Sequence, residues 1–299
     1  MSVRHPTPER LPFAKMQGVG NDFVVVDARR LPESDWPSRS RDLCDRHLGV
    51  GADGLIAVDT SSIADVAMRM YNPDGTPDFC GNGLRCVTRF VLDPPGARRE
   101  SLTVDATLSI QTLRGVREVR LQHDGGGSVT VTVDMDRPRF DPLDIPMGLP
   151  RGPVVDHPVD AAGEELVITA LSTGSTHAVA LVDTLPEDER FVRVSRAVEE
   201  HRLFPERTSL MWAVVEAWDR LRLRIWERGA GETWGCGTGA CAAVVAATLR
   251  GLVGERVRVV SAGGELEVWW PDRDRLWLTG PAEYVFVGSY PLEPRRGAG

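Results

Sequence analysis

Residues 226–241 read WERGAGETWGCGTGAC and lead directly into the apolar run AAVVAA of residues 242–247. Residues 221–226, LRLRIW, alternate apolar and charged side chains, which is typical of a half-buried strand. The run of small residues after Gly239 is too long for a strand and predicts a tightly packed helix. Cys236 is therefore expected at a helix N-terminus, where unpaired N–H groups and the helix dipole stabilise anions. Such a position favours the thiolate of Cys236 and can also hold a carboxylate.

The same pattern occurs once more in the chain. Residues 79–86 read FCGNGLRC and precede a second apolar helix-like segment, and Cys80 and Cys236 lie 156 residues apart, about half the chain. Gly20 lies 60 residues before Cys80, and Gly174 lies 62 residues before Cys236, each in a similar context. We infer an internal duplication in which each half contributes one cysteine at a helix N-terminus. The two thiols are most useful if they face each other across a cleft.

The composition limits the classes of function. A chain of 299 residues favours two domains. A net charge of −8 gives no basic surface for nucleic acid or an anionic membrane, so we expect a small-molecule substrate and no nucleic-acid or membrane partner. The first ten residues lack the apolar core of a signal peptide, which predicts a cytoplasmic protein. The odd number of cysteines, five, fits reduced thiols better than a disulfide framework.

Short strands with few helices, in two halves, predict an α+β protein of two similar domains. Six prolines in residues 138–158 indicate an exposed linker, so we place the domains at residues 1–140 and 141–299, with a last strand that can return to the first domain. The remaining expectations are local. They are a Pro/Ser loop at Leu31–Ser40, a strand at Leu102–Val104, a helix at Val192–His201, a hairpin turning at Trp218–Asp219 and a frayed tail at Glu293–Gly299.

Six segments together resemble the signature segments of the diaminopimelate epimerase family, which are amino-acid racemases and epimerases that work without pyridoxal phosphate. The segments are KMQGVGNDF (15–23), GADG (51–54), NPDG (72–75), CGNGLR (80–85), ERGAGET (227–233) and CGTGA (236–240). The resemblance implies two domains of one fold, each a curved, mostly antiparallel sheet around a central helix, with the substrate in the cleft between them. It also implies a reaction without a cofactor and a protein that can form a homodimer.

The chemistry of inversion agrees with the residues. Inverting an α-carbon needs a base on one face and an acid on the other, and Cys80 and Cys236 can fill these roles. N–H groups at the two helix starts would hold the α-carboxylate and stabilise the charge that develops on the α-carbon. The groups expected there are those of Gly81, Asn82, Gly237 and Thr238. By resemblance His177 and Glu227 tune the protonation of the thiols, while Asn21, Asn72 and Arg228 hold the substrate.

The chain departs from the family pattern at two positions that contact substrate. Ser175 and Ser209 stand where the family usually has asparagine. A hydroxyl cannot make the paired contacts of a carboxamide, so the grip on the far end of the substrate must differ. Asn72 and Arg228 favour a distal carboxylate as in diaminopimelate, whereas the two serines favour a specialised racemase of another amino acid, such as O-ureidoserine or histidine. A non-catalytic protein that only binds an amino acid is the alternative of another class.

The other cysteines have a structural interpretation. Cys86 and Cys241 fall inside the predicted helices, and together with Cys44 they are expected to pack in the core as small hydrophobic residues. No second cysteine or histidine pair completes a four-ligand zinc site with Cys236 and Cys241, so we expect no metal. Neither glycine loop has the lysine and hydroxyl of a phosphate-binding P-loop.

Overall fold

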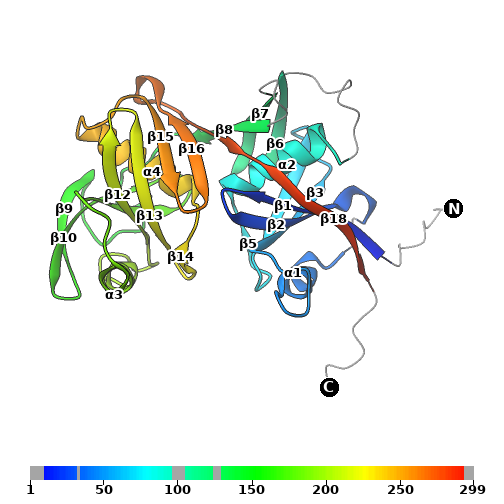
Figure 1. Ribbon diagram of the computed structural model, residues 1–299, viewed down its shortest axis with the longest axis horizontal. Helices are drawn as coiled ribbons and strands as arrows, with labels where there is room; N and C mark the ends of the chain where they lie inside the picture. Colours follow the sequence, from blue (N-terminus) through cyan, green and yellow to red (C-terminus); the bar gives the residue numbers. More distant parts are fainter. Residues whose placement is uncertain (1–9, 32–33, 96–104, 124–128, 293–299) are drawn as a thin grey trace. The chain divides into compact units, whose positions relative to one another are not determined.

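The computed structural model describes residues 10–31, 34–95, 105–123 and 129–292 (Figure 1). The strand expected at Leu102–Val104 and the tail expected at Glu293–Gly299 lie outside these residues. Within them, no helix is both long enough and apolar enough to cross a membrane.

The described chain separates into two compact units. The first takes in the chain up to Gln17, from Asp22 to His123 and again from Ala282, and the second takes in Gly18–Asn21 and the chain from Asp124 to Pro281. The sequence placed the division at residue 140, whereas the second unit already includes β8 (Val129–Asp136), because β8 pairs with β17 (Leu276–Pro281). The last strand, β18 (Glu283–Pro291), returns to the first unit and pairs with β1 (Arg10–Gly18).

The first unit is a mostly antiparallel sheet. Its strands pair in the order β18, β1, β2, β3, β4, β6, β7, with the short β5 added to β4, and only the pairs β2/β3 and β4/β6 are parallel. The further elements are β2 (Asn21–Asp27), η1 (Ala28–Arg30), α1 (Trp36–Cys44), β3 (Gly54–Asp59), β4 (Val66–Tyr71), β5 (Pro77–Asp78), α2 (Gly81–Leu92), β6 (Asp105–Thr112) and β7 (Gly115–His123).

The second unit repeats this plan. Its strands pair in the order β9, β10, β11, β12, β13, β15, β16, β17, β8, with the short β14 added to β13, and only β11/β12 and β13/β15 are parallel. The further elements are β9 (Val154–Ala161), β10 (Glu164–Ser172), β11 (Thr176–Leu181), α3 (Asp188–Glu199), β12 (Ser209–Ala217), β13 (Arg220–Glu227), β14 (Gly231–Thr233), α4 (Gly237–Leu249), β15 (Arg256–Ser261), β16 (Gly264–Trp269) and η3 (Pro271–Arg273).

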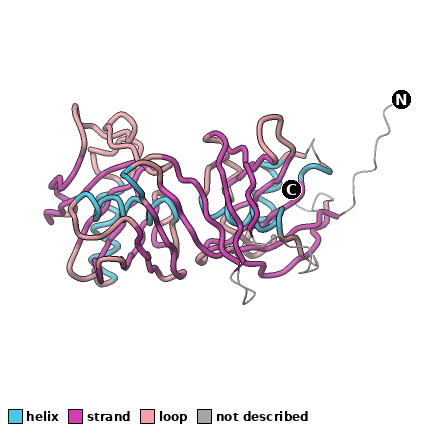
Figure 2. The backbone as a smooth tube through the Cα atoms, turned by 90° about the horizontal axis from the view of Figure 1, so that it is seen from above, coloured by secondary structure: helices cyan, strands magenta, loops and turns pink. Residues whose placement is uncertain are grey.

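The two units correspond element by element. The parallel pairs β2/β3 and β11/β12 are each connected through a helix, α1 or α3, and the pairs β4/β6 and β13/β15 through α2 or α4. The glycines noted in the sequence also correspond, since Gly20 and Gly174 precede β2 and β11 and both adopt a positive φ, of 82° and 108°. The predicted α+β class and internal duplication are confirmed, and strands take up far more of each unit than helices do (Figure 2).

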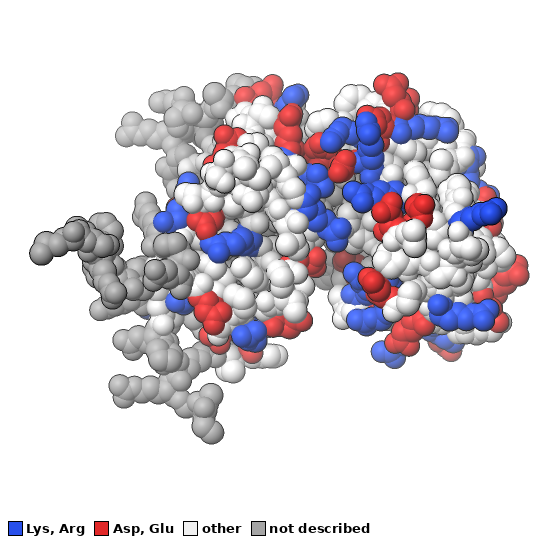
Figure 3. Space-filling view, turned by 180° about the vertical axis from the view of Figure 1, so that it is seen from behind, with Lys and Arg blue, Asp and Glu red and all other residues white. Residues whose placement is uncertain are grey.

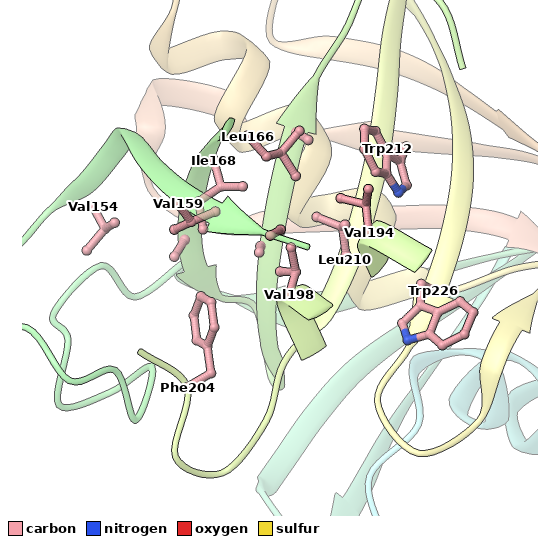
Figure 4. Close-up of a cluster of buried hydrophobic side chains, with 14 of the residues drawn as sticks. Val154, Val159, Leu166, Ile168, Val194, Val198, Phe204, Leu210, Trp212 and Trp226 are labelled. Carbon is pink, nitrogen blue, oxygen red and sulfur yellow. The ribbon is translucent and has the colours of Figure 1, made fainter. Parts of the chain in front are cut away.

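One helix in each unit packs against the concave run of strands. Helix α2 contacts β3, β4, β6 and β7, and α4 contacts β10 to β13 and β15 to β17. Every residue of α4 from Gly237 to Thr248 is buried, because alanine, glycine and valine let the strands approach from all sides. A separate core cluster of the second unit joins α3 to β9–β13, with Trp212 and Trp226 among its largest side chains (Figure 4).

Three local expectations need correction. The predicted linker at 138–158 is not exposed throughout, because Ile145, Met147 and Val154 are buried in the α3 cluster. The predicted Pro/Ser loop contains the start of α1, because proline is also tolerated in the first turn of a helix. Asp35 caps this helix, and its side chain accepts the Ser38 N–H. Helix α3 begins four residues before the predicted Val192, with two acidic residues in its first turn that suit the helix dipole. The hairpin between β12 and β13 turns where predicted.

Acidic and basic side chains are interspersed over the surface. On the face shown in Figure 3, patches of both signs alternate across both units. Arg220 illustrates the pattern, because its guanidinium contacts both Glu216 and Glu265 on neighbouring strands.

Candidate active site

Both cysteines of the repeated motif are the N-caps of the central helices. Cys80 caps α2 with φ −139° and ψ 120°, and Cys236 caps α4 with φ −132° and ψ 111°. Each sulfur accepts the backbone N–H of the residue three positions on, Gly83 or Gly239, at 3.4 Å. The predicted position at a helix N-terminus is therefore confirmed for both.

The second glycine of each motif is required by close packing. A Cβ at Gly83 would lie 2.9 Å from Ile56 Cδ1, and a Cβ at Gly239 would lie 2.4 Å from Met211 Sδ. Ile56 and Met211 belong to β3 and β12, which are corresponding strands of the two units. Glycine at this position thus lets the first turn of each helix lie directly on the equivalent strand, and its N–H reaches the sulfur.

Cys236 is buried among hydrogen-bonding groups. Its side chain is only 6% exposed, and its sulfur lies 3.4 Å from Thr238 Oγ1. Burial raises the pKa of the Cys236 thiol well above its usual range, and the charge of Glu227, to which the thiol donates, raises the pKa further. The Thr238 hydroxyl and the Gly239 N–H oppose this shift. The expectation that the helix N-terminus favours the thiolate of Cys236 is wrong here, because burial and the carboxylate outweigh the helix.

Glu227 is held in place by a residue that the sequence did not single out. Thr233 on β14 donates its hydroxyl to Glu227 Oε1 at 2.6 Å, across the β13–β14 hairpin. Thr233 falls within the quoted segment ERGAGET, so the motif contained it, but a short hairpin strand at residues 231–233 was not expected.

His177 is buried and uncharged. Its side chain is 1% exposed, and burial followed by the charge of Arg228 lowers the pKa of His177 to about 3. Its Nε2 lies 2.9 Å from Ser175 Oγ, whereas among the described residues Nδ1 finds no hydrogen-bond partner. A neutral imidazole at every physiological pH can donate or accept a hydrogen bond at Nε2.

The two serines that replace the family's asparagines are both engaged within the protein. Ser209 Oγ accepts the Arg228 N–H at 3.1 Å, and Ser175 Oγ contacts His177 and, at 3.2 Å, Thr238 Oγ1. Arg228 is exposed, and its guanidinium donates to the Glu206 carbonyl at 2.8 Å. The second unit thus brings together His177, Ser175, Ser209, Glu227, Arg228, Cys236, Gly237 and Thr238.

Glu199 was missed by the sequence analysis. It is 5% exposed at the end of α3, and its carboxylate accepts Gly229 N at 2.9 Å, Trp226 Nε1 at 2.7 Å and Arg207 Nη1 at 3.1 Å. These bonds fix the chain on both sides of the Glu227–Arg228 pair. No motif marks Glu199, because Trp226 and Gly229 lie 27 and 30 residues away in sequence.

The first unit holds the other predicted residues. Cys80 is partly exposed, and the N–H groups of Gly81 and Asn82 open α2 beside it. Asn72 follows β4 and donates to Thr76 Oγ1 at 3.1 Å within the NPDG turn. Asn21 begins β2, but by its contacts it is grouped with the second unit.

The remaining cysteines are core residues. Cys44, Cys86 and Cys241 are buried and form no disulfide, and burial raises the pKa of Cys86 to about 12. Among the described residues, no group of three or more His, Cys, Asp or Glu side chains is arranged to hold a metal ion.

Comparison with known proteins gives consistent matches along the chain. The sequence profile of the family described as diaminopimelate epimerase matches residues 13–140 and 169–285. The diaminopimelate epimerase of Pelotomaculum thermopropionicum is 41% identical over 282 residues, covering 93% of this chain and 98% of that protein. That of Moorella thermoacetica is 43% identical over 285 residues, covering 94% and 99%.

Solved structures share the fold at low identity. A hydroxyproline epimerase from Agrobacterium vitis superimposes with a TM-score of 0.69 at 16% identity, covering 96% of this chain and 93% of that one. A phenazine biosynthesis protein from Bacillus anthracis gives a TM-score of 0.64 at 19% identity, covering 94% and 99%. At such identities the likeness speaks for the fold alone.

Proposed function

We propose that this protein inverts an α-carbon of diaminopimelate with the thiols of Cys80 and Cys236. The chain belongs to the diaminopimelate epimerase family, and it is an isomerase of the racemase and epimerase type. The observation that carries the proposal is the repeated N-cap geometry. Two corresponding helices each present a cysteine whose sulfur accepts the N–H of the third helical residue at 3.4 Å. Two acid–base groups of one kind suit a reaction that removes a proton from one face of a carbon and returns one to the other.

The protonation of Cys236 suggests how the roles divide. Its raised pKa keeps Cys236 as a thiol at neutral pH, so in this state it is the acid and Cys80 is the base. The Cys80 thiolate takes the α-proton, and the Cys236 thiol delivers its own proton to the opposite face. The forward reaction leaves Cys80 as a thiol and Cys236 as a thiolate, which the Thr238 hydroxyl and the Gly239 N–H stabilise, so in the reverse reaction Cys236 takes the α-proton and Cys80 returns one.

The substrate's carboxylate can be bound by the helix starts. The first N–H groups of an α-helix have no partner within the helix, and the dipole adds positive potential there. Gly81 and Asn82 open α2, and Gly237 and Thr238 open α4, each beside a proposed catalytic cysteine. The same groups would stabilise the negative charge that spreads onto the carboxylate as the α-proton leaves.

The choice of diaminopimelate over a monocarboxylic amino acid has two supports. Relatives about 40% identical over most of their length are diaminopimelate epimerases. The contacts of Ser175 and Ser209 are directed to His177, Thr238 and the Arg228 backbone, so the serines help to hold the site and Arg228 stays available for a distal carboxylate. Both points favour the dicarboxylic substrate over O-ureidoserine or histidine.

A deuterium-exchange assay tests the function. The protein is incubated in deuterated water with LL-diaminopimelate and a panel of monocarboxylic amino acids, and loss of the α-proton and formation of the meso isomer are followed by NMR. We expect both for diaminopimelate without added pyridoxal phosphate. Exchange with only a monocarboxylic amino acid would contradict diaminopimelate as the substrate but not the two-thiol mechanism. Binding of an amino acid without any exchange would indicate a non-catalytic binding protein.

Arg228→Ala tests the distal carboxylate. Loss of a charged hydrogen-bonding partner for a substrate carboxylate is worth about 1.5–3 kcal/mol, so we expect KM for diaminopimelate to rise on the order of 10- to 100-fold. Arg222→Ala is the matched control and should leave KM unchanged. Arg222 lies on β13, the strand that precedes Arg228, and forms an exposed ion pair with Glu216. An unchanged KM in Arg228→Ala would remove the main argument for a second carboxylate.

Two further expectations belong to this proposal. None of the five cysteines forms a disulfide, which supports a reducing, cytoplasmic location. A homodimer is supported by β18, where three successive apolar residues, Val285, Phe286 and Val287, are exposed.

A further inference from the structure

We propose that Ser175 is a positioning residue for Cys236, because it links the buried His177 to Thr238 and so directs the Thr238 hydroxyl at the Cys236 sulfur. This inference rests on the proposed function, in which Cys236 must lose and regain a proton. It assigns Ser175 to the thiol, whereas the sequence analysis assigned it to the substrate.

The contacts form one continuous chain of hydrogen bonds within the second unit. His177 Nε2 lies 2.9 Å from Ser175 Oγ, Ser175 Oγ lies 3.2 Å from Thr238 Oγ1, and Thr238 Oγ1 lies 3.4 Å from Cys236 Sγ. The backbone of Thr238 is fixed separately, since its carbonyl accepts the Thr173 hydroxyl at 2.8 Å. The chain therefore runs from β11 through the preceding turn to the first turn of α4.

The direction of the chain follows from counting donors. The Cys236 thiol donates its proton to Glu227, so its sulfur acts as an acceptor for Thr238 O–H and Gly239 N–H. Thr238 Oγ1 then accepts from Ser175 O–H, and Ser175 Oγ accepts from His177 Nε2–H. Every donor in this arrangement has an acceptor.

The opposite direction leaves a buried donor without a partner. It would need the tautomer of His177 with the proton on Nδ1, which has no partner among the described residues. A buried unsatisfied N–H costs about 1–3 kcal/mol, whereas an unused acceptor lone pair costs less. The low pKa of His177 fits the same assignment, because an uncharged imidazole serves as a fixed hydrogen-bond donor and takes up no proton at neutral pH.

The effect of the chain is on the thiolate form of Cys236. When Cys236 delivers its proton to the α-carbon, the sulfur becomes an anion, and a Thr238 O–H already aimed at it strengthens into a charge-assisted hydrogen bond. Without Ser175, the Thr238 hydroxyl can rotate to another acceptor. The chain of hydrogen bonds transfers no proton itself, since the proton of Cys236 moves only between its sulfur and the α-carbon.

Three variants test the inference by kinetics. Ser175→Ala should lower kcat about tenfold, as expected for the loss of one hydrogen-bonded link, with KM changed less than about twofold. Ser175→Thr keeps the hydroxyl and should restore most of kcat. Thr176→Val is the matched control, because it removes a neighbouring hydroxyl that bonds the Ile145 carbonyl and no group of the site. A Ser175→Ala enzyme with the kcat of Thr176→Val, or with only KM raised, would overturn the inference.

Two measurements do not depend on turnover. Nitrogen-15 NMR of labelled histidine, with His177 assigned by its loss in His177→Asn, should show the Nε2–H tautomer in the wild type and a changed Nε2–H signal in Ser175→Ala. Alkylation of Cys236 by iodoacetamide, read by mass spectrometry, should slow severalfold in Ser175→Ala and not in Thr176→Val. An Nδ1–H tautomer or an unchanged alkylation rate would contradict the chain. Should the wild type invert no amino acid while these signals behave as expected, the proposed function fails and the chain from His177 to Cys236 stands.

Discussion

The starts of α2 and α4 share a backbone and differ in their surroundings. Cys80 and Cys236 cap their helices with nearly the same φ and ψ, and each sulfur accepts the same N–H at the same distance. Cys236, however, is nearly inaccessible at the start of a helix buried along its length, whereas Cys80 is partly exposed on a helix that is buried only through Thr88. The duplicated fold therefore supplies identical main-chain donors, and the side chains around them set each thiol's proton affinity.

This difference is clearest at the ends of two corresponding strands, β13 and β4. Strand β13 ends in Glu227, a carboxylate next to Cys236, and the corresponding β4 is followed by Asn72, which carries no charge. A carboxylate raises the pKa of a neighbouring thiol and can also accept its proton, and a carboxamide does neither. Two copies of one motif can thus provide an acid and a base.

The largest expected effect comes from removing either sulfur. Cys80→Ser and Cys236→Ser should each lower kcat on the order of a thousandfold or more, because a hydroxyl is a far weaker acid and base than a thiol. Cys241→Ser, a buried cysteine five residues after Cys236, is the matched control for loss of a sulfur and should retain turnover. Epimerisation measured by NMR decides, and near-normal turnover in either of the first two variants would end the two-thiol mechanism.

The comparison is sharpened by removing the charge that lies beside Cys236. Glu227 raises the pKa of Cys236, so Glu227→Gln should lower this pKa and move the pH profile of Cys236 alkylation towards lower pH. Turnover should nevertheless fall about 100-fold, because the carboxylate that accepts the S–H hydrogen bond and keeps Cys236 protonated as the acid is lost.

Glu232→Gln is the control for this variant. Glu232 lies on the adjacent β14 and pairs with Arg224 at 2.8 Å, away from the thiol. It should change neither the alkylation profile nor turnover. An alkylation profile of Glu227→Gln that stays in place or moves towards higher pH would show that burial alone sets the proton affinity of Cys236.

The sequence was sufficient for features that a local pattern determines. The N-cap positions of Cys80 and Cys236 follow from a Cys-Gly-x-Gly motif before an apolar run, and the repetition of that motif implies the duplicated fold. The protonation of Cys236 could not be predicted in this way, since burial depends on strands that pack against α4 from throughout the second unit. The same holds for Glu199, whose partners Trp226 and Gly229 come to it only through the fold.

The smallest expected effect concerns the glycines that follow the cysteines by three positions. An alanine Cβ at Gly83 would meet the terminal Cδ1 of Ile56 at 2.9 Å, which a small rotation of that side chain can relieve. At Gly239 it would meet Met211 Sδ at 2.4 Å and Cε at 3.0 Å, a closer approach by two atoms, so the neighbours must move further. Alanine gains about 1 kcal/mol of helix propensity over glycine in both places, whereas overpacking costs about 1–3 kcal/mol. Gly83→Ala should therefore leave the midpoint of urea unfolding almost unchanged, and Gly239→Ala should lower it. A larger loss in Gly83→Ala would mean that the tighter packing lies at the start of α2, and that the closed surroundings of Cys236 are not what separates the two sites.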